Sequence, residues 1–465
     1  MTRMSQSKYH IITLGCQMNK SDSERIAALL DGIGMEETSR PEEADLVLMN
    51  SCSVRQTAED RIFGLTHRFA ALRESNPRLV IGVTGCMAGR DKDGSLRRKL
   101  TDVDLFFSTA DMVHLPQWLA ERGLVGHSPT ASDVGSDYLG ITPRHSNPFQ
   151  AFIPIQTGCS NFCTYCVVPY SRGLEKNRPA ADILKEVREL ADKGTIEVTL
   201  LGQTVNSYRA PDPQSFSAGN PYSDHFAALL WEINQVPGIR RIHYTAPHPK
   251  HMTDEVIDAL ALPKHVNYLH LPVQSGSDAM LARMNRKYTR ADYLDVIRRI
   301  KARVPDIALG TDIIVGFCGE SEAMFEETVS MYKEVGFDIS YTAMYSPRTG
   351  TPSWRAFEDD VPRGEKKRRW RRLHELMEEI VREKNGKFVG QTVEVLVESC
   401  AKGSCSGNSR EMKLVRFPGG PELVGRIVPV RVEKAREWVL DGVKREEREK
   451  REPPPHPSPA KRGRE

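Results

Sequence analysis

The feature that most constrains this chain is a short segment that contains three cysteines, Cys159, Cys163 and Cys166. Their spacing is C-x3-C-x2-C, and no fourth Cys or His follows closely to complete a four-ligand zinc site. Three thiolates suit an iron–sulfur cluster that keeps one iron open to an exchangeable ligand. Two alternatives stay open at this point, which are a three-cysteine zinc site completed by a distant His and three buried thiols.

Apolar runs that alternate with helical patterns surround this segment. The run Phe152–Ile155 ends just before the cysteines, which places them at the carboxyl end of a strand, the catalytic face of β/α barrels. A helical pattern such as Ala180–Asp192 separates further strands, so residues 149–388 predict βα repeats. The further strands are expected at Glu197–Leu201, Arg241–Tyr244, Val266–Leu271, Ala308–Val315 and Ile339–Met344.

The spacing C-x3-C-x-aromatic-C, with Tyr165 as the aromatic, resembles the signature of the radical S-adenosylmethionine enzymes. This resemblance implies a 4Fe–4S cluster on Cys159, Cys163 and Cys166. It implies that the open iron binds S-adenosylmethionine, and that electron transfer yields a 5′-deoxyadenosyl radical that abstracts hydrogen from the substrate. It also implies that the repeats form a partial (β/α)6 barrel whose open side admits large substrates.

Residues 8–125 show βαβα order, which predicts an open α/β domain with a parallel sheet. Three of its expected strands run into Cys16, Cys52 and Cys86. Because ligands sit beyond the carboxyl ends of strands in open α/β sheets, these cysteines are expected to converge and to hold a second cluster. The alternative is three ordinary buried thiols. The expected strands are Tyr9–Leu14, Leu46–Met49, Leu79–Val83 and Val103–Phe107.

The phrases around these cysteines, Leu-Gly-Cys16-Gln-Met-Asn, Asn-Ser-Cys52-Ser-Val-Arg and Thr-Gly-Cys86, resemble the N-terminal domain of the methylthiotransferases, a radical-enzyme subfamily. The resemblance implies an auxiliary 4Fe–4S cluster that handles the sulfur to be inserted. One departure is Gly89, where the subfamily often has Gln.

Several expected strand ends resemble cofactor contacts of the family, and the alternative for each is ordinary turn chemistry and capping. Leu200–Gln203 resembles the segment that meets the methionine amino group, and His270–Asp278 the segment near the ribose and carboxylate. In Ile313–Glu320, beside the adenine, Cys318 replaces the usual Pro and is interpreted as a tolerated small residue. The expected cofactor residues are Tyr165, Gly202, Gln203, Gln274 and Ser275.

The composition of the chain indicates in which compartment the protein resides and which partners its charge favours. The 465 residues include nine cysteines, an odd number, and the N-terminus lacks the apolar core of a signal peptide. No apolar run approaches the length of a membrane span, so we expect a cytoplasmic protein with reduced thiols. A net charge of +3 is nearly balanced, so only local charge indicates a nucleic-acid partner.

Local charge concentrates in the helical stretch 361–388, where a basic run is opposed only by Glu365 up to position 372. Such a face binds phosphates, although a solvated face is the equal alternative. Residues 389–442 resemble TRAM, a small β-barrel that binds tRNA in this family, with strands at Thr392–Val397, Lys413–Phe417, Gly425–Val432 and Trp438–Leu440. The expected RNA-binding residues are Arg368, Arg369, Arg371, Arg372 and Lys413.

The remaining segments are interpreted by composition. Residues 126–148 are rich in Ser, Pro, Gly and Thr and predict a linker, whereas residues 443–465 alternate charges and prolines and predict a disordered tail. Cys400 and Cys405 are expected to be free thiols, because two cysteines alone make no metal site.

Together the resemblance spans about residues 8 to 440 and implies a radical methylthiotransferase with two 4Fe–4S clusters. One S-adenosylmethionine would methylate sulfur at the auxiliary cluster and a second would yield the radical, so each turnover uses two. The segment Gln17–Asn19 resembles the branch that acts on N6-isopentenyladenosine beside the tRNA anticodon.

Other substrates and one other class of protein are the alternatives. The substrate alternatives are N6-threonylcarbamoyladenosine in tRNA and an aspartate of a ribosomal protein. The alternative from another class is a non-catalytic iron–sulfur sensor that binds RNA. The expected partners are tRNA and an electron donor such as flavodoxin or ferredoxin, with no membrane; the sulfur source and oligomeric state are left unassigned.

Overall fold

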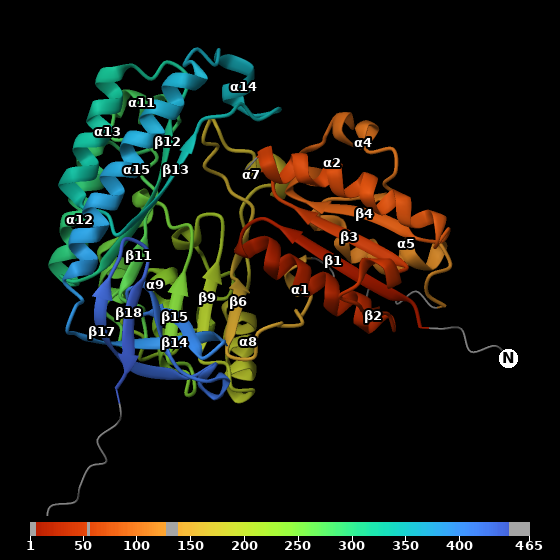
Figure 1. The fold of residues 1–465 in the computed structure, drawn as a ribbon, viewed down its shortest axis with the longest axis horizontal. Helices are drawn as coiled ribbons and strands as arrows, with labels where there is room; N and C mark the ends of the chain where they lie inside the picture. The colour runs from red at the N-terminus through yellow and green to blue at the C-terminus, as the bar shows by residue number, and fades with distance from the viewer. Residues whose placement is uncertain (1–5, 54–55, 127–137, 446–465) are drawn as a thin grey trace, which may run out of the picture. The chain divides into compact units, whose positions relative to one another are not determined.

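The computed structural model describes residues 6–53, 56–126 and 138–445, and the chain forms two compact units, Met1–Val381 and Arg382–Glu465. Figure 1 shows the order of their helices and strands. The predicted tail from residue 446 onward and residues 127–137 of the predicted linker lie outside the described residues. No helix in the described ranges is long and apolar enough to cross a membrane.

The N-terminal part is a parallel sheet, as predicted, and it has five strands in the order β2-β1-β3-β4-β5, of which the sequence prediction missed β2. Its central strands are buried along their whole length, which explains their nearly continuous apolar sequence. Helices cover both faces of the sheet (Figure 1). The strands are β1 (Lys8–Leu14), β2 (Glu36–Glu37), β3 (Leu46–Ser51), β4 (Val80–Gly85) and β5 (Leu105–Phe106). The helices are α1 (Gln17–Gly32), α2 (Gln56–Ala70), α3 (Cys86–Arg90), α4 (Ser95–Lys99) and α5 (Leu115–Glu121).

Part of the segment predicted as a linker belongs to this N-terminal core. Tyr138, Leu139 and Ile141 are buried among residues of α1 and α5. The Tyr138 hydroxyl donates a hydrogen bond to Asp22 of α1 at 2.5 Å. In the described end of the predicted linker 126–148, Tyr138, Leu139 and Ile141 therefore pack against distant helices, a contact that composition does not show.

The six predicted strands of the barrel are all present and parallel. They form two three-stranded sheets, β10-β9-β6 and β11-β12-β13, which Ile242 and His265 join through a parallel bridge. The barrel is therefore partial, with β6 and β13 as its edge strands. The strands are β6 (Gln150–Pro154), β9 (Glu197–Leu201), β10 (Arg241–Tyr244), β11 (Tyr268–His270), β12 (Ala308–Val315) and β13 (Ile339–Met344), and a short ribbon pairs β7 (Gln156–Thr157) with β8 (Lys176–Asn177).

Helices pack on the outer side of these strands in one large apolar core. Side chains cap several of them, such as Asp224 at α9 and Thr289 in a capping box at α12. The helices are α7 (Val168–Arg172), α8 (Ala180–Asp192), α9 (His225–Gln235), α10 (Asp254–Ala259), α11 (Asp278–Arg283), α12 (Arg290–Arg303), α13 (Glu322–Val335), α14 (Pro352–Ala356) and α15 (Arg363–Gly386).

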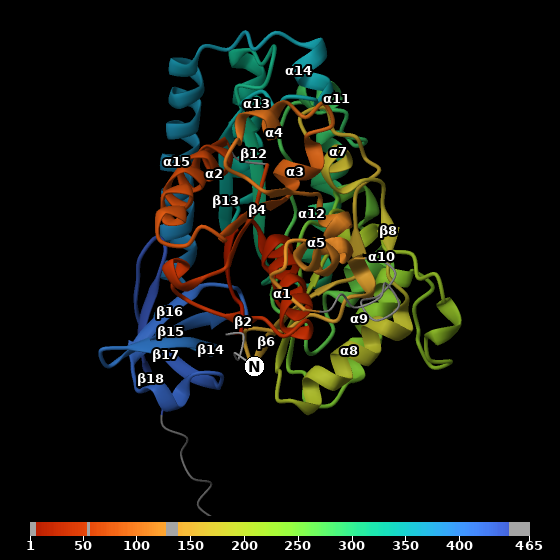
Figure 2. The same cartoon turned by 90° about the vertical axis from the view of Figure 1, so that its right-hand side faces the viewer.

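The second unit contains a closed barrel of five strands with the order β14-β15-β16-β18-β17 (Figure 2). Its neighbouring strands are antiparallel except for β16 and β18, which are parallel. The sequence prediction of four strands missed β15 and placed the last strand too early. The strands are β14 (Thr392–Ala401), β15 (Ser404–Ser409), β16 (Leu414–Pro418), β17 (Ile427–Ala435) and β18 (Leu440–Lys444).

Cys400 and Cys405 form a disulfide, so the prediction of two free thiols is wrong. The two residues stand opposite each other in the antiparallel pair of β14 and β15. The hairpin brings together the side chains of residues that face one another across two strands, and a spacing in sequence does not reveal that register.

Candidate functional site

Strand register brings the three N-terminal cysteines to one edge of the first sheet. Leu14 pairs with Ser51, and Ser51 pairs with Gly85, so the three strands end at the same level. Cys52 and Cys86 are the next residues of their strands, and Cys16 lies one residue further on. Because adjacent strands lie about 4.8 Å apart, the three thiols meet beyond one edge.

Glycines make room for this convergence. Gly15 has a φ of +152°, and a Cβ there would lie 2.9 Å from the Cβ of Cys52. Gly85 has a φ of +94°, and a Cβ there would overlap the carbonyl oxygen of Ser51. Burial raises the pKa of Cys16, and the neighbouring thiol of Cys86 raises it further. The residues around these thiols therefore fit a bulky group held by Cys16, Cys52 and Cys86.

The barrel cysteines lie in a tight loop after β7. Gly158 begins it with a φ of +71°, where a Cβ would overlap the carbonyl oxygen of Leu174. The backbone N–H of Asn161 donates to Cys159 Sγ, and that of Val168 donates to Cys166 Sγ, both at 3.5 Å. Burial raises the pKa of the Cys166 thiol to about 12, and the thiols of Cys163 and Cys159 contribute to this shift. The three side chains are thus close together.

These sulfur atoms receive hydrogen bonds of the kind that tune iron–sulfur clusters. Arg286 donates to Cys163 Sγ at 3.4 Å, and Thr204 lies 3.4 Å from Cys159 Sγ through its hydroxyl. In the described ranges no three Cys, His, Asp or Glu side chains are arranged to hold a single metal ion.

Arg172 links the two cysteine sets. It lies at the end of α7, a few residues after Cys166, and its Nε donates to Cys86 Sγ at 3.3 Å. Its guanidinium also pairs with Asp22 of α1 at 2.5 Å, and both side chains are 1% exposed. Burial lowers the pKa of Arg172, but Asp22 and Cys86 hold it well above the ordinary value. This buried cation joins the loop of one cysteine set to a sulfur of the other.

The departure at Gly89 has a packing reason. A Cβ at Gly89 would overlap the carbonyl oxygen of Ser171, because α3 packs directly against α7. A larger side chain at this position would separate α3, which begins at Cys86, from the helix that carries Arg172.

Four of the predicted cofactor residues follow the carboxyl ends of two strands. Gly202 and Gln203 follow β9, and Gln274 and Ser275 follow β11. Gln203 is half-buried, and Gln274 has a φ of +73° that its backbone bonds to β12 maintain. No residue in the described part of the chain bonds to the side-chain amide of Gln203 or Gln274. Gly202 is buried next to Gln156, which accepts a hydrogen bond from Thr204 N.

Ser275 makes hydrogen-bonding contacts within the protein. Its hydroxyl is buried, lies 3.3 Å from Thr328 of α13 and accepts a bond from Ser277 N. These contacts support the loop that follows β11, and the role of Ser275 toward a cofactor stays a prediction. Tyr165 packs in an apolar cluster with Phe317 and the buried Cys318, which is consistent with the interpretation of Cys318 as a small packing residue.

The sequence analysis did not predict that polar side chains contact the sulfur atoms. Asn161, Arg172, Thr204 and Arg286 have no spacing signal, and only the fold brings the last two to the cysteine loop. Arg286 has no carboxylate partner in the described residues, and Tyr165 and Tyr288 raise its pKa against the lowering effect of burial.

The predicted basic face of α15 is mostly engaged with acidic residues. Arg369 is 4% exposed and donates to Glu320 at 2.8 Å, while Arg368 pairs with Glu322 and Arg372 with Glu326. These carboxylates come from α13 and the loop before it, so the arginines hold α15 on the barrel.

Ion pairs engage Arg368, Arg369 and Arg372, while the Arg368 and Arg372 side chains stay 47% and 41% exposed, so RNA binding by these residues stays a prediction. Lys413 is also mostly buried, at 8% exposure. Arg371 remains exposed and forms no ion pair within the described part of the chain. Exposed cations also occur on the small barrel, such as Arg416 of β16 and Arg431 of β17.

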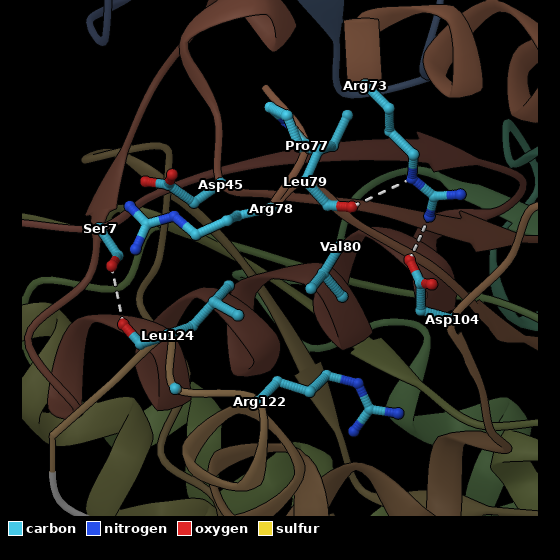
Figure 3. A pocket seen from close by; sticks show the side chains of 11 residues that line it. Ser7, Asp45, Arg73, Pro77, Arg78, Leu79, Val80, Asp104, Arg122 and Leu124 are labelled. Atoms are coloured by element: carbon cyan, nitrogen blue, oxygen red, sulfur yellow. Dashed lines mark hydrogen bonds and ion pairs between the residues drawn. The ribbon is translucent and has the colours of Figure 1, made fainter. Parts of the chain in front are cut away.

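A separate pocket of about 560 Å³ lies at the opposite edge of the N-terminal sheet (Figure 3). Residues at the starts of the strands line it, and Arg73 bridges Asp104 and the carbonyl oxygen of Leu79. The cysteines follow the other ends of the same strands, so this pocket takes no part in their chemistry.

Three protein families match the chain. Residues 153–332 match the radical SAM superfamily, residues 8–108 match the uncharacterized protein family UPF0004, and residues 386–444 match the TRAM domain. These matches agree with the barrel, the N-terminal sheet and the small closed barrel described above.

Curated relatives match nearly the whole chain. A tRNA-2-methylthio-N(6)-dimethylallyladenosine synthase from Moorella thermoacetica is 42% identical and covers 94% of this chain and 98% of its own length. The protein of the same name from Geobacillus kaustophilus is 42% identical over 94% of this chain and 82% of its own length.

Among solved structures, the radical S-adenosylmethionine methyltransferase TsrM from Kitasatospora setae is similar in fold. Its complex with tryptophan and a cofactor analogue matches with a TM-score of 0.52 and 13% identity, covering 86% of this chain and 78% of that protein. At this identity the likeness concerns the fold alone.

Proposed function

This chain belongs to the family of the tRNA-2-methylthio-N(6)-dimethylallyladenosine synthases, and from this premise we propose how its residues divide the reaction between two sites. The protein is a radical S-adenosylmethionine transferase that converts the C2–H bond of N6-isopentenyladenosine, next to the tRNA anticodon, into C2–S–CH3. The names of the relatives favour this branch over the threonylcarbamoyladenosine and ribosomal aspartate alternatives.

We propose two 4Fe–4S sites, one held by Cys16, Cys52 and Cys86 and one by Cys159, Cys163 and Cys166. When bound, these clusters supply the reductive cleavage of S-adenosylmethionine and the site at which sulfur is methylated and inserted, with two S-adenosylmethionine molecules used per turnover. The observation that carries the proposal is Arg172, which donates to a sulfur of one set and lies in the helix that follows the other.

The residues of the chain have distinct tasks in this proposal. Arg172 and Asp22 form a buried neutral pair that fixes the two cysteine sets relative to each other. Arg286 has no carboxylate partner among the described residues, so it suits the carboxylate of the cofactor, a fork-shaped match of two N–H donors to two oxygens. Gln203 and Gln274 offer side-chain amides that bond to no other described residue at the strand ends, and Gly202 has no side chain to cover the backbone there.

We propose tRNA and an electron donor such as flavodoxin or ferredoxin as the partners, and the cytoplasm as the location. The direct test of the function is nucleoside mass analysis. Anaerobically reconstituted protein, given reductant and S-adenosylmethionine, should convert N6-isopentenyladenosine in tRNA to a nucleoside in which SCH3 replaces one hydrogen. The matched control is the same tRNA without the isopentenyl group. Cleavage of the cofactor with no heavier nucleoside would contradict this substrate.

Exposed cations outside the ion pairs of α15 should contribute to tRNA affinity. Replacing Arg371, Arg416 and Arg431 by Gln should weaken binding and reduce the salt slope by about one unit for each residue that meets a phosphate. The measurement is tRNA affinity over a salt series, with Arg298→Gln on α12 as a control for the loss of one exposed arginine elsewhere on the surface. An unchanged slope in the triple variant would remove these residues from the RNA interface.

A further inference from the structure

Register and side-chain alternation place a set of polar and aromatic residues on the inner face of the half-barrel β11-β12-β13. His270 stands opposite Gly310, and Asp312 stands opposite Tyr341. The residues of the other face, such as Leu269 and Leu309, are buried in the core together with residues of α12 and α13. Because side chains alternate along a strand, His270, Asp312 and Tyr341 face the interior of the barrel.

This interior is closed at one end and open at the other. At the amino ends of the strands, Arg241 pairs with Glu197 at 2.8 Å, and both side chains are almost fully buried. One layer further along, His243 and Tyr268 are also buried. Toward the carboxyl ends, the Asp312 side chain is 40% exposed. The inner face therefore opens on the side where the cysteine loop lies.

Because Gly310 has no side chain, it leaves room for a hydrogen-bonded chain of Tyr268 and His270 next to Asp312. A Cβ at Gly310 would overlap the Tyr268 hydroxyl and would lie 2.5 Å from His270 Nδ1. Tyr268 lies 3.0 Å from this Nδ1, and His270 Nε2 lies 3.2 Å from the Asp312 carboxylate. If Tyr268 donates to Nδ1, the Nε2–H donates to Asp312, so the ring fixes one carboxylate oxygen. No described residue donates a hydrogen bond to the other oxygen.

Tyr341 adds an aromatic surface beside this carboxylate. It lies on β13, an edge strand of the partial barrel, and is 55% exposed. Its ring centroid lies 5.7 Å from that of His270. A tyrosine exposed next to a hydrogen-bond acceptor inside an open barrel has the composition of a nucleobase site, since bases stack on aromatic rings and show polar groups at their edges.

We propose that Tyr341 and Asp312 form the recognition site for the N6-substituted adenine of the tRNA substrate, an inference that rests on the proposed function. Tyr341 stacks on the purine, and the free oxygen of Asp312 accepts a hydrogen bond from the single N6–H that an N6-alkylated adenine retains. His270 and Tyr268 are positioning residues, because they orient the carboxylate. The open edge of the barrel beside β13 lets the base enter while the RNA stays outside.

The N6–H requirement gives a sharp test. Two anticodon stem-loop RNAs differ only at the target, one with N6-isopentenyladenosine and one with N6-methyl-N6-isopentenyladenosine, which has no N6–H. Reconstituted wild-type enzyme should bind the first about tenfold more tightly, as expected for one hydrogen bond to a charged acceptor. Asp312→Ala should remove most of this preference, and His270→Gln should reduce it.

Substitution of Tyr341 should change the affinity for both RNAs and not the preference between them. Tyr341→Leu should weaken the binding of both RNAs about tenfold. The ratio of the two dissociation constants should stay the same, because stacking does not depend on N6–H. Tyr341→Phe keeps the ring and is the matched control. Its side chain is exposed on an edge strand, so the substitutions should preserve the fold, which iron content and circular dichroism verify.

Several outcomes would overturn the site. One is that the Asp312→Ala variant still prefers the RNA with an N6–H as strongly as the wild-type enzyme does. Another is that the Tyr341→Leu variant binds both RNAs with wild-type affinity. The adenine of S-adenosylmethionine shares this chemistry, so its dissociation constant is measured in the same variants; weaker cofactor binding with unchanged RNA binding would also overturn the proposal. If the wild-type enzyme forms no methylthio product on the first RNA, the proposed function itself fails. Product formation with unaffected variants removes only the inference.

Discussion

A variant in which Cys16, Cys52 and Cys86 are all alanine is expected to cleave S-adenosylmethionine but to form no methylthio product. The reason is that the two cysteine sets that we propose as cluster ligands lie in different parts of the fold. These three thiols follow β1, β3 and β4, whereas the other three lie in one loop of the barrel. The barrel site keeps its own ligands and its sulfur hydrogen bonds from Asn161, Val168 and Arg286 when the first set is removed.

The measurement is release of 5′-deoxyadenosine together with mass analysis of the tRNA nucleosides under reducing, anaerobic conditions. The product should fall below detection while 5′-deoxyadenosine formation continues. The double variant Cys400→Ser/Cys405→Ser is the matched control, since it changes two cysteines outside both sets and should retain product. Loss of 5′-deoxyadenosine in a folded triple variant would contradict the division between the two sites.

Replacing Cys159, Cys163 and Cys166 by alanine should have the complementary effect, which is loss of all cofactor cleavage and of half the iron. Anaerobically reconstituted wild-type protein is expected to hold about eight irons, and the variant about four. In this variant Arg172 still donates a hydrogen bond to Cys86, so the proposed N-terminal cluster should keep its hydrogen-bond donor.

Iron and sulfide analysis, with circular dichroism to verify folding, tests this second expectation. Cys318→Ala is a suitable control because Cys318 is buried in an apolar cluster and should not affect iron content. Full iron content in the triple variant would show that these residues are not cluster ligands. Complete loss of iron without unfolding would show that the two sets do not hold separate clusters.

The sequence by itself determined the features that depend on neighbouring residues. The spacing of Cys159, Cys163 and Cys166 predicts their convergence because a short loop cannot separate them. Strand prediction was also enough to bring Cys16, Cys52 and Cys86 together, since parallel strands end at one edge and each cysteine follows a strand. The six strands of the partial barrel follow from apolar runs that the helices bury.

Only the tertiary structure decided the roles of residues whose partners lie far away in the chain. The basic run of α15 has one acidic neighbour in sequence, but α13 and its preceding loop add Glu320, Glu322 and Glu326. These ion pairs join α15 to the barrel, a contact that the sequence of the basic run does not reveal.

The same reason explains Arg172, the Cys400–Cys405 disulfide and the inner face with Asp312. Arg172 meets Asp22 across a sequence separation of 150 residues, and the disulfide depends on the register of one hairpin. Asp312 and Tyr341 come together because two parallel strands pair in one register; a shift by one residue would turn one of them to the opposite face. Spacing in sequence sets local geometry, whereas burial, ion pairing and register arise only when distant segments pack together.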